Sequence, residues 1–234
     1  MRPLLLISGM LLVGAGAIVW TAPDWLVDLI AERYPGCLYR VSTREPILAL
    51  TLDDGPDSVS TPLILNQLRK HGARATFFLI SERIQGQEQL VRSIVAEGHE
   101  LGNHFTYQRP GIRLTSQEFE QDLLRAHRVL TRFSQPVWAR PASGWYTGTM
   151  VNAMRRHGYS CALGSVYPFD AAVPSVSWAS RYVLRNARPG AIVVLHDRGG
   201  RGRRTARVLA AVLPVLQKRG YRVVPLSQLS RTVR

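Results

Sequence analysis

The chain has little cysteine, lysine or acid for its 234 residues. Its two cysteines, Cys37 and Cys161, are too few for a disulfide framework and too far apart in the chain for a cysteine zinc site. Whether they form one bridge is left open. With 46% apolar residues, 19 glycines and 14 prolines the composition is that of a globular protein, which excludes a disordered or collagen-like chain. The length fits one domain with an appendage.

Basic residues outnumber acidic ones by 30 to 16, a net charge of +14, and all but Lys70 and Lys218 are arginine. Such a balance favours anionic neighbours. Only Arg198–Arg204 is a true basic cluster, and it contains no aromatic side chain that could stack on a base. We therefore interpret the arginines as a solvated surface and expect no nucleic-acid partner.

One long run without charge, Leu4–Trp20, stands near the N-terminus. As a helix rising about 1.5 Å per residue it is just long enough to cross a bilayer. Arg2 precedes the run and acidic residues follow it, so the positive-inside rule places the body outside the cytoplasm. We expect an uncleaved membrane anchor. The alternative is a cleaved signal peptide with Ala15–Ala17 as its cleavage site, which would make the protein secreted.

Seven short apolar runs follow, each with a helix-like segment behind it. This repeat predicts a parallel sheet with crossover helices. No Gly-x-Gly-x-x-Gly follows the first strand, which excludes an ordinary dinucleotide-binding fold, and seven units are too few for a regular eight-unit barrel. The predicted strands are Ile47–Leu52, Ala75–Ile80, His99–Gly102, Val137–Ala139, Tyr159–Leu163, Ala191–Leu195 and Tyr221–Pro225.

Unusual polar residues stand at the C-terminal ends of these strands, where parallel α/β folds place their active sites. Asp53 and Asp54 are adjacent, and two neighbouring carboxylates are costly unless a cation such as a metal ion or an arginine holds them. The other polar residues at strand ends are Asn103, His104, Arg140, Asp170, His196 and Asp197.

Residues 45–231 resemble the polysaccharide deacetylases of carbohydrate esterase family 4, the NodB homology domain. Three segments carry the likeness most closely, and Arg140–Gly144 and Tyr167–Asp170 are looser matches. The expected fold is therefore α/β, a distorted seven-unit (β/α) barrel of this type, preceded by the one N-terminal transmembrane or signal helix. The three closest segments are Thr51–Pro56, Gly98–His104 and Ala191–Asp197.

The same resemblance implies roles for four catalytic residues in N-deacetylation. Asp53 would be the general base that activates water, and Arg140 would orient it. His196 would protonate the departing amine, a role that suits a side chain whose pKa lies close to the working pH. Asp170 would steady the cationic form of His196.

A second group would bind substrate and metal. Asp54 and His104 would hold a divalent metal ion, with zinc expected, that polarises the acetyl carbonyl. The family pattern places a second histidine four residues after the first, where this chain has Gln108, whose amide oxygen is a weaker ligand for such metals. The residues expected on the substrate are Leu195 beside the acetyl methyl, the Ser143 N–H on the oxyanion, and Trp145 and Tyr146 on a sugar ring.

We therefore expect a membrane-anchored extracytoplasmic hydrolase that removes N-acetyl groups from an amino-sugar polymer of the cell envelope. Two alternatives stay open: a metal-independent amidohydrolase acting on a small amide, favoured by Gln108, and a non-catalytic glycan-binding protein. The expected partners are an N-acetylated glycan and the membrane. The expected division is an anchor or signal segment over 1–22, a juxtamembrane amphipathic segment over 23–44, and a catalytic domain over 45–234.

Overall fold

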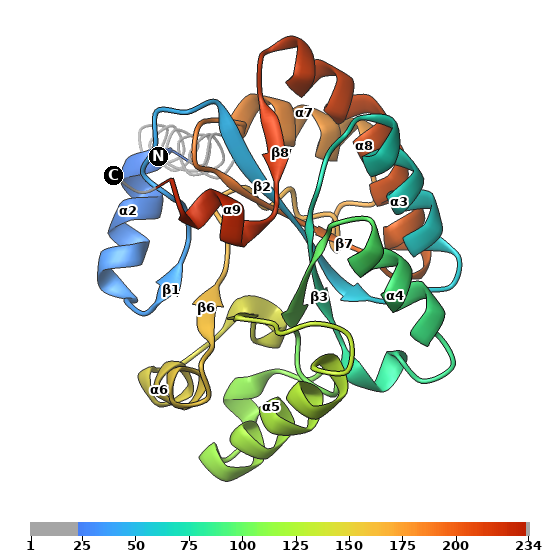
Figure 1. Cartoon of the computed structure of the whole chain (residues 1–234). Helices are drawn as coiled ribbons and strands as arrows, with labels where there is room; N and C mark the ends of the chain where they lie inside the picture. The colour runs from blue at the N-terminus through green and yellow to red at the C-terminus, as the bar shows by residue number, and fades with distance from the viewer. Residues whose placement is uncertain (1–22, 233–234) are drawn as a thin grey trace, which may run out of the picture.

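The computed structural model describes residues 23–232, an α/β arrangement in which helices surround a curved parallel sheet (Figure 1). The strands are β1 (Cys37–Leu38), β2 (Ile47–Gly55), β3 (Thr76–Leu79), β4 (Glu100–Asn103), β5 (Trp138–Ala139), β6 (Ser160–Ala162), β7 (Ile192–His196) and β8 (Arg222–Val224). The α-helices are α2 (Asp24–Arg33), α3 (Ser60–Lys70), α4 (Glu88–Ala96), α5 (Ser116–Leu130), α6 (Gly148–Arg156), α7 (Val176–Asn186), α8 (Gly199–Lys218) and α9 (Leu226–Ser230). Short 3-10 turns lie at Ser81–Arg83, Gly111–Arg113 and Ala142–Gly144.

All seven predicted strands are present, and the parallel α/β sheet is confirmed. Strands pair in the order β1-β6-β5-β4-β3-β2-β7, and β8 pairs with the start of β2. An isolated bridge between Arg40 and Ala191 links the β1 segment to the start of β7, so the two ends of the sheet meet. The strand β1 was not predicted, and the sheet therefore begins before residue 45.

Side chains on β2 alternate between two environments, as a strand buried on both faces requires. Leu50 and Leu52 pack into the core that also contains side chains of α3 and α8. Ala49 belongs to the second core cluster, inside the curve of the sheet. Thr51 and Asp53 continue that inner face toward the C-terminal end of the strand, so the inner face changes from apolar to polar where β2 ends.

The predicted amphipathic segment forms α2, and β1 follows it. Trp25 and Tyr34 are well exposed, whereas Val27 is buried against the body. A disulfide joins Cys37 on β1 to Cys161 on β6, which settles the pairing that the sequence left open. The expected anchor over residues 4–20 lies outside the described residues, and within 23–232 no helix is long and apolar enough to cross a membrane.

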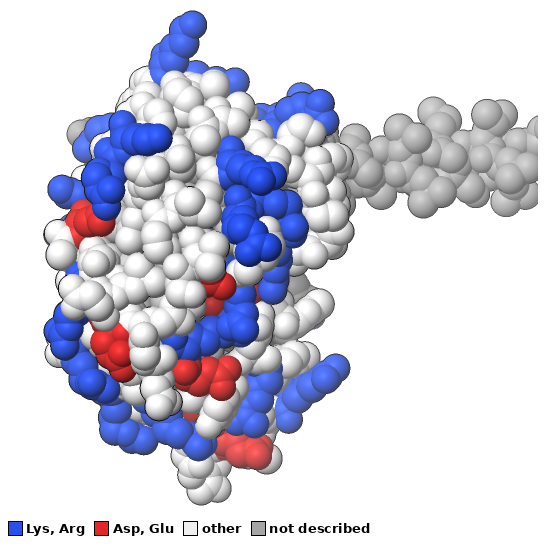
Figure 2. All heavy atoms as spheres, turned by 90° about the vertical axis from the view of Figure 1, so that its right-hand side faces the viewer, with Lys and Arg blue, Asp and Glu red and all other residues white. Residues whose placement is uncertain are grey.

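Basic side chains are spread in several groups over the face formed by α3, α4 and α8, with few acidic side chains between them (Figure 2). Arg198 and Arg203 of the basic cluster are exposed. These residues fit the expected solvated arginine surface. Arg201 does not, because its guanidinium forms an ion pair with a buried carboxylate, described below.

Candidate active site

A cleft of about 530 Å³ opens at the C-terminal ends of the strands. It contains most of the polar residues that the sequence placed there, which supports the expectation that parallel strands converge on one active site. Apolar lining comes from Leu163 and Val194. The polar and charged side chains lining the cleft include Tyr39, Asp53, Asp54, His104, Gln108, Arg109, Arg140, Ser143, Tyr167, His196 and Arg201.

Asp53 and Asp54 both line this cleft although neighbours on a strand normally point to opposite faces. Asp54 has a φ of 75°, in the left-handed region that a non-glycine residue rarely occupies. This backbone turn at the end of β2 breaks the alternation and brings the second carboxylate to the same side as the first. Both are almost completely buried.

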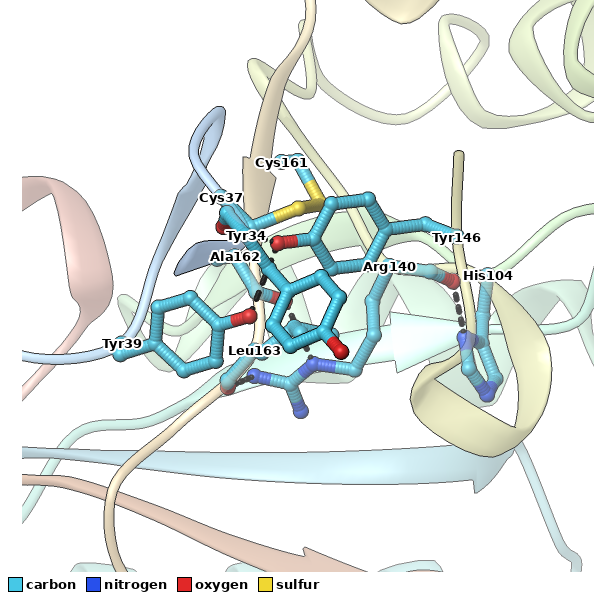
Figure 3. The surroundings of a disulfide bond; sticks show 9 residues. All are labelled: Tyr34, Cys37, Tyr39, His104, Arg140, Tyr146, Cys161, Ala162 and Leu163. Atoms are coloured by element: carbon cyan, nitrogen blue, oxygen red, sulfur yellow. Dashed lines mark hydrogen bonds between the residues drawn. A yellow bond between two sulfur atoms is a disulfide. The ribbon is translucent and has the colours of Figure 1, made fainter. Parts of the chain in front are cut away.

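Arg140 holds Asp53 through a buried network, and Figure 3 shows the part of it that binds Arg140 to the backbone of Ala162 and Leu163. Its Nη1 donates to Asp53 Oδ1 at 2.6 Å and to the Thr51 hydroxyl at 2.9 Å. Its Nε and Nη2 donate to the backbone oxygens of Ala162 and Leu163 at 2.8 and 2.5 Å. These two residues directly follow Cys161, so the disulfide fixes the segment that positions Arg140.

His196 and Asp170 form the second buried pair. His196 Nδ1 lies 2.9 Å and 3.0 Å from the two Asp170 carboxylate oxygens, which leaves Nε2 for the cleft. Burial alone lowers the pKa of His196, but the hydrogen bond and charge of Asp170, with Asp53 and Asp54 nearby, raise it above its ordinary value. The register pairs Asp53 with His196 on adjacent strands, so this site combines a buried carboxylate with a histidine whose pKa is raised by its own carboxylate partner.

Asp54 is the centre of a different set of contacts. His104 Nδ1 is 2.6 Å from the Arg140 carbonyl oxygen, so its Nε2 faces Asp54, 3.6 Å from Oδ1. Gln108 Nε2 donates to Asp54 Oδ2 at 2.9 Å, and Arg201 Nη2 lies 3.3 Å from the same oxygen. Burial raises the pKa of Asp54, but His104, His196 and Arg201 outweigh it and hold that pKa well below the usual range.

Gln108 cannot turn its oxygen toward a metal ion at Asp54 without losing another contact. Its Oε1 accepts from Arg83 Nη2 at 2.6 Å. A guanidinium only donates, so the amide atom facing Arg83 must be the oxygen, and the atom facing Asp54 must be the nitrogen. The expected third ligand is therefore a hydrogen-bond donor to Asp54, which corrects the role we expected for Gln108.

The donor set does not fit the expected metal ion. Of the three expected ligands Asp54, His104 and Gln108, two offer ligand atoms, while the Gln108 N–H and the Arg201 guanidinium occupy the other side of the Asp54 carboxylate. Among residues 23–232 no three His, Cys, Asp or Glu side chains gather as a metal site would require. The Arg201 guanidinium already supplies the positive charge that balances the Asp54 carboxylate.

Leu195, Trp145 and Tyr146 do not line the cleft, and for Leu195 this contradicts the expected contact with the acetyl methyl. Leu195 is fully buried among the side chains of the outer core, because alternation along β7 sends residues 194 and 196 toward the cleft and residue 195 away from it. Val194 and Leu163 take its place. Trp145 is 67% exposed and does not line the cleft, and the Tyr146 hydroxyl pairs with that of Tyr39 at 2.8 Å. Ser143 lies in the cleft as expected.

Sequence reasoning missed three residues that shape the site. Arg83 fixes Gln108 and also donates to the Asp54 backbone oxygen at 2.5 Å. The Asp57 carboxylate accepts from the Gly199 N–H at 3.0 Å and so fixes the first residue of α8. Arg201 was assigned to the solvated surface. Its place soon after the His196–Asp197 strand end, where active-site loops begin, was the signal that could have found it.

The chain is similar in sequence to known polysaccharide deacetylases. The polysaccharide deacetylase profile matches residues 40–162. A peptidoglycan-N-acetylglucosamine deacetylase of Bacillus cereus is 37% identical over 196 residues, covering 82% of this chain and 92% of that protein. A chitooligosaccharide deacetylase of Bradyrhizobium is 36% identical over 195 residues, covering 77% and 89%. The chain is a hydrolase and belongs to the polysaccharide deacetylase family, whose enzymes are generally metal-dependent.

Solved structures of the same family share the fold of this chain. A peptidoglycan N-acetylglucosamine deacetylase superposes with a TM-score of 0.81 at 28% identity, over 90% of this chain and all of that one. A family 4 pseudoenzyme from Bacillus anthracis matches with a TM-score of 0.78 at 25% identity, covering 86% of this chain and 70% of that one. The fold thus occurs in an active enzyme and in a protein described as a pseudoenzyme, and only the site can distinguish these outcomes.

Proposed function

We propose that the protein is an N-deacetylase that hydrolyses the acetamide of an amino sugar in a cell-envelope polymer. One observation carries the proposal. Asp53 and His196 lie opposite each other on β2 and β7, and each is held by its own buried partner, Arg140 and Asp170. A glycan-binding groove needs neither a positioned base nor a positioned acid, so this pairing favours catalysis over binding alone.

The steps follow from these side chains. Asp53, oriented by its 2.6 Å contact with Arg140, accepts a proton from water as the water oxygen bonds to the acetyl carbon. The Ser143 backbone N–H donates to the oxyanion that forms. His196 Nε2 then gives its proton to the amine nitrogen as the C–N bond breaks, and acetic acid and the free amine leave. No step uses a metal ion, because the side chains around Asp54 do not fit the zinc ion that we expected.

The substrate class comes from the relatives. Proteins similar to this chain are named for peptidoglycan N-acetylglucosamine and for chitooligosaccharides. A further relative, 28% identical over 202 residues, is named for peptidoglycan N-acetylmuramic acid. All of these substrates carry an acetamide on a sugar of a polymer or oligomer. A cleft of about 530 Å³ admits one such sugar with its acetyl group between Leu163 and Val194.

We also propose that the enzyme works outside the cytoplasm, anchored through residues 1–22. The Cys37–Cys161 disulfide supports this location, because such bonds persist in oxidising compartments. Trp25, Leu29 and Tyr34 on and beside α2 are exposed, and aromatic side chains suit a membrane interface. Carbonate washing of membranes and intact-mass analysis test the anchor: a mature N-terminus near Ile18 would show cleavage instead.

Acetate release tests the activity. The full chain is incubated with peptidoglycan, chitooligosaccharides and a set of small amides, beside Asp53→Asn and a control, Glu97→Gln, at the opposite end of the sheet. We expect acetate from a glycan, a loss of about 10²–10⁴-fold in Asp53→Asn, and no loss in the control. Release from small amides alone would favour the amidohydrolase alternative. No hydrolysis of any substrate would refute the proposal.

A further inference from the structure

Arg201 lies in the cleft but has no role in the steps proposed above. Its guanidinium lines the cleft together with both aspartates and lies 3.3 Å from Asp54 Oδ2. The Asp54 side chain is 3% exposed, whereas that of Arg201 is 29% exposed. One edge of the guanidinium therefore holds a buried carboxylate while the rest of the group is open to a ligand in the cleft.

This position is built by the first turn of α8. The Gly199 N–H is held by Asp57, and the Thr205 hydroxyl donates to the His196 carbonyl oxygen at 2.7 Å. Gly202 packs against Ser60 so closely that an added Cβ would come within 2.5 Å of the Ser60 Cβ. The turn is thus fixed against β7 and α3, and Arg201 is held at the site by its backbone as well as by its charge.

The geometry points to Arg201 as the catalytic cation of this site: it binds the scissile carbonyl oxygen in place of a divalent metal ion, so that hydrolysis needs no metal. This inference rests on the proposed function. It explains the departure from the family pattern at Gln108, which is locked by Arg83 as a donor to Asp54, and it gives a role to the guanidinium that already neutralises that carboxylate.

The chemistry balances without any further cofactor. As Asp53 takes a proton from water, the new C–O bond pushes the carbonyl electrons onto oxygen. Arg201 has five N–H donors, and those not used by Asp54 can donate to this oxyanion in the cleft, beside Ser143. The oxyanion then collapses, the C–N bond breaks, and His196 supplies the proton that the amine requires. The products are acetic acid, which ionises in water, and the amine, and transfer of the Asp53 proton to His196 through solvent returns both side chains to their starting states.

Kinetics of Arg201→Gln, Arg201→Lys and the control Arg203→Gln test this role. Arg203 lies in the same helix but is exposed. We expect Arg201→Gln to lower kcat by about 10²–10³-fold with a smaller change in KM, as for loss of an oxyanion donor. Arg201→Lys should recover part of the rate, because it keeps the charge but not the fork of donors. Equal rates for Arg201→Gln and Arg203→Gln would overturn the inference.

A second measurement does not depend on turnover. Zinc is titrated calorimetrically into the full chain and into the double variant Gln108→His with Arg201→Gln, which supplies a third ligand and removes the competing cation. We expect no stoichiometric binding by the wild type and binding at a ratio of one by the double variant. Tight zinc binding by the wild type would overturn the inference even if the proposed deacetylation holds. Failure of every glycan to release acetate, with the zinc result as expected, would instead refute the proposed function and the carbonyl step with it.

Discussion

The floor of the cleft has two halves that balance buried charge in different ways. In the base–acid half, Asp53 is paired with Arg140 and His196 with Asp170, each within 2.9 Å. In the Asp54 half, one carboxylate is surrounded by His104, Gln108 and Arg201, and its nearest charged nitrogen is 3.3 Å away. The first half contains the four residues to which the family resemblance gives catalytic roles, and the second half has Gln108 where that pattern has a histidine. If Arg201 binds the carbonyl oxygen as we propose, the proton-transfer residues are kept while the group that polarises the carbonyl differs.

The largest effect is expected from breaking the base–acid half at Arg140. Arg140→Met leaves Asp53 as a buried carboxylate without its partner, which costs about 3–5 kcal/mol of unfolding free energy. Loss of the oriented base should also remove most acetate release. Urea unfolding and kinetics measure both. Arg156→Met, which breaks an exposed pair with Glu120 at 2.9 Å, is the matched control and should leave the unfolding midpoint unchanged.

The disulfide tests whether the base–acid half depends on its support. Replacing both cysteines, Cys37→Ser with Cys161→Ser, opens a loop of 124 residues and should lower the unfolding free energy by about 2–5 kcal/mol. The activity should also fall, because the oxygens of Ala162 and Leu163 that hold Arg140 directly follow Cys161. A variant that loses stability but keeps full kcat at low temperature would show that the disulfide stabilises the fold without positioning Arg140.

Asp170→Asn tests the base–acid half through the pH dependence of kcat. Burial lowers the pKa of His196 and Asp170 raises it, with the net shift upward, so removing that charge should lower the pKa of His196. The alkaline limb of kcat should therefore move to lower pH. Because the folded pKa of His196 exceeds the unfolded value of about 6.5, its contribution to stability is complete below that pH and is lost as pH rises through the folded pKa. The variant should be destabilised most at acidic pH, and an unshifted limb would contradict the role of Asp170.

The smallest effect is expected outside both halves, at Trp145. This side chain is 67% exposed and lies beside the cleft residues Ser143 and Gly144 in sequence. If it stacks on a neighbouring sugar of the polymer, Trp145→Ala should raise KM a few-fold for long chitooligosaccharides and leave a disaccharide unaffected. Equal effects on both lengths, or none, would remove Trp145 from the substrate contacts.

Features that depend on a local sequence pattern could be predicted from the sequence. The seven apolar runs became strands, and the capping box at Thr115 and Glu118 begins α5 as its sequence indicates. Alternation along β7 contained the information that Leu195 faces away from the cleft. Other features depend on contacts distant in the chain: the disulfide joins residues 124 positions apart, and Arg201 reaches Asp54 only because α8 packs against α3 through Gly202.

The central claim is that this cleft performs deacetylation with the cation of Arg201 and not with a metal ion. The most direct measurement is the rate of acetate release by the full chain before and after exhaustive treatment with dipicolinate, with metal content determined on the same samples. The account predicts equal rates and no bound metal in stoichiometric amount, and added zinc should not increase the rate. Loss of activity on chelation, restored by one equivalent of zinc, would contradict it.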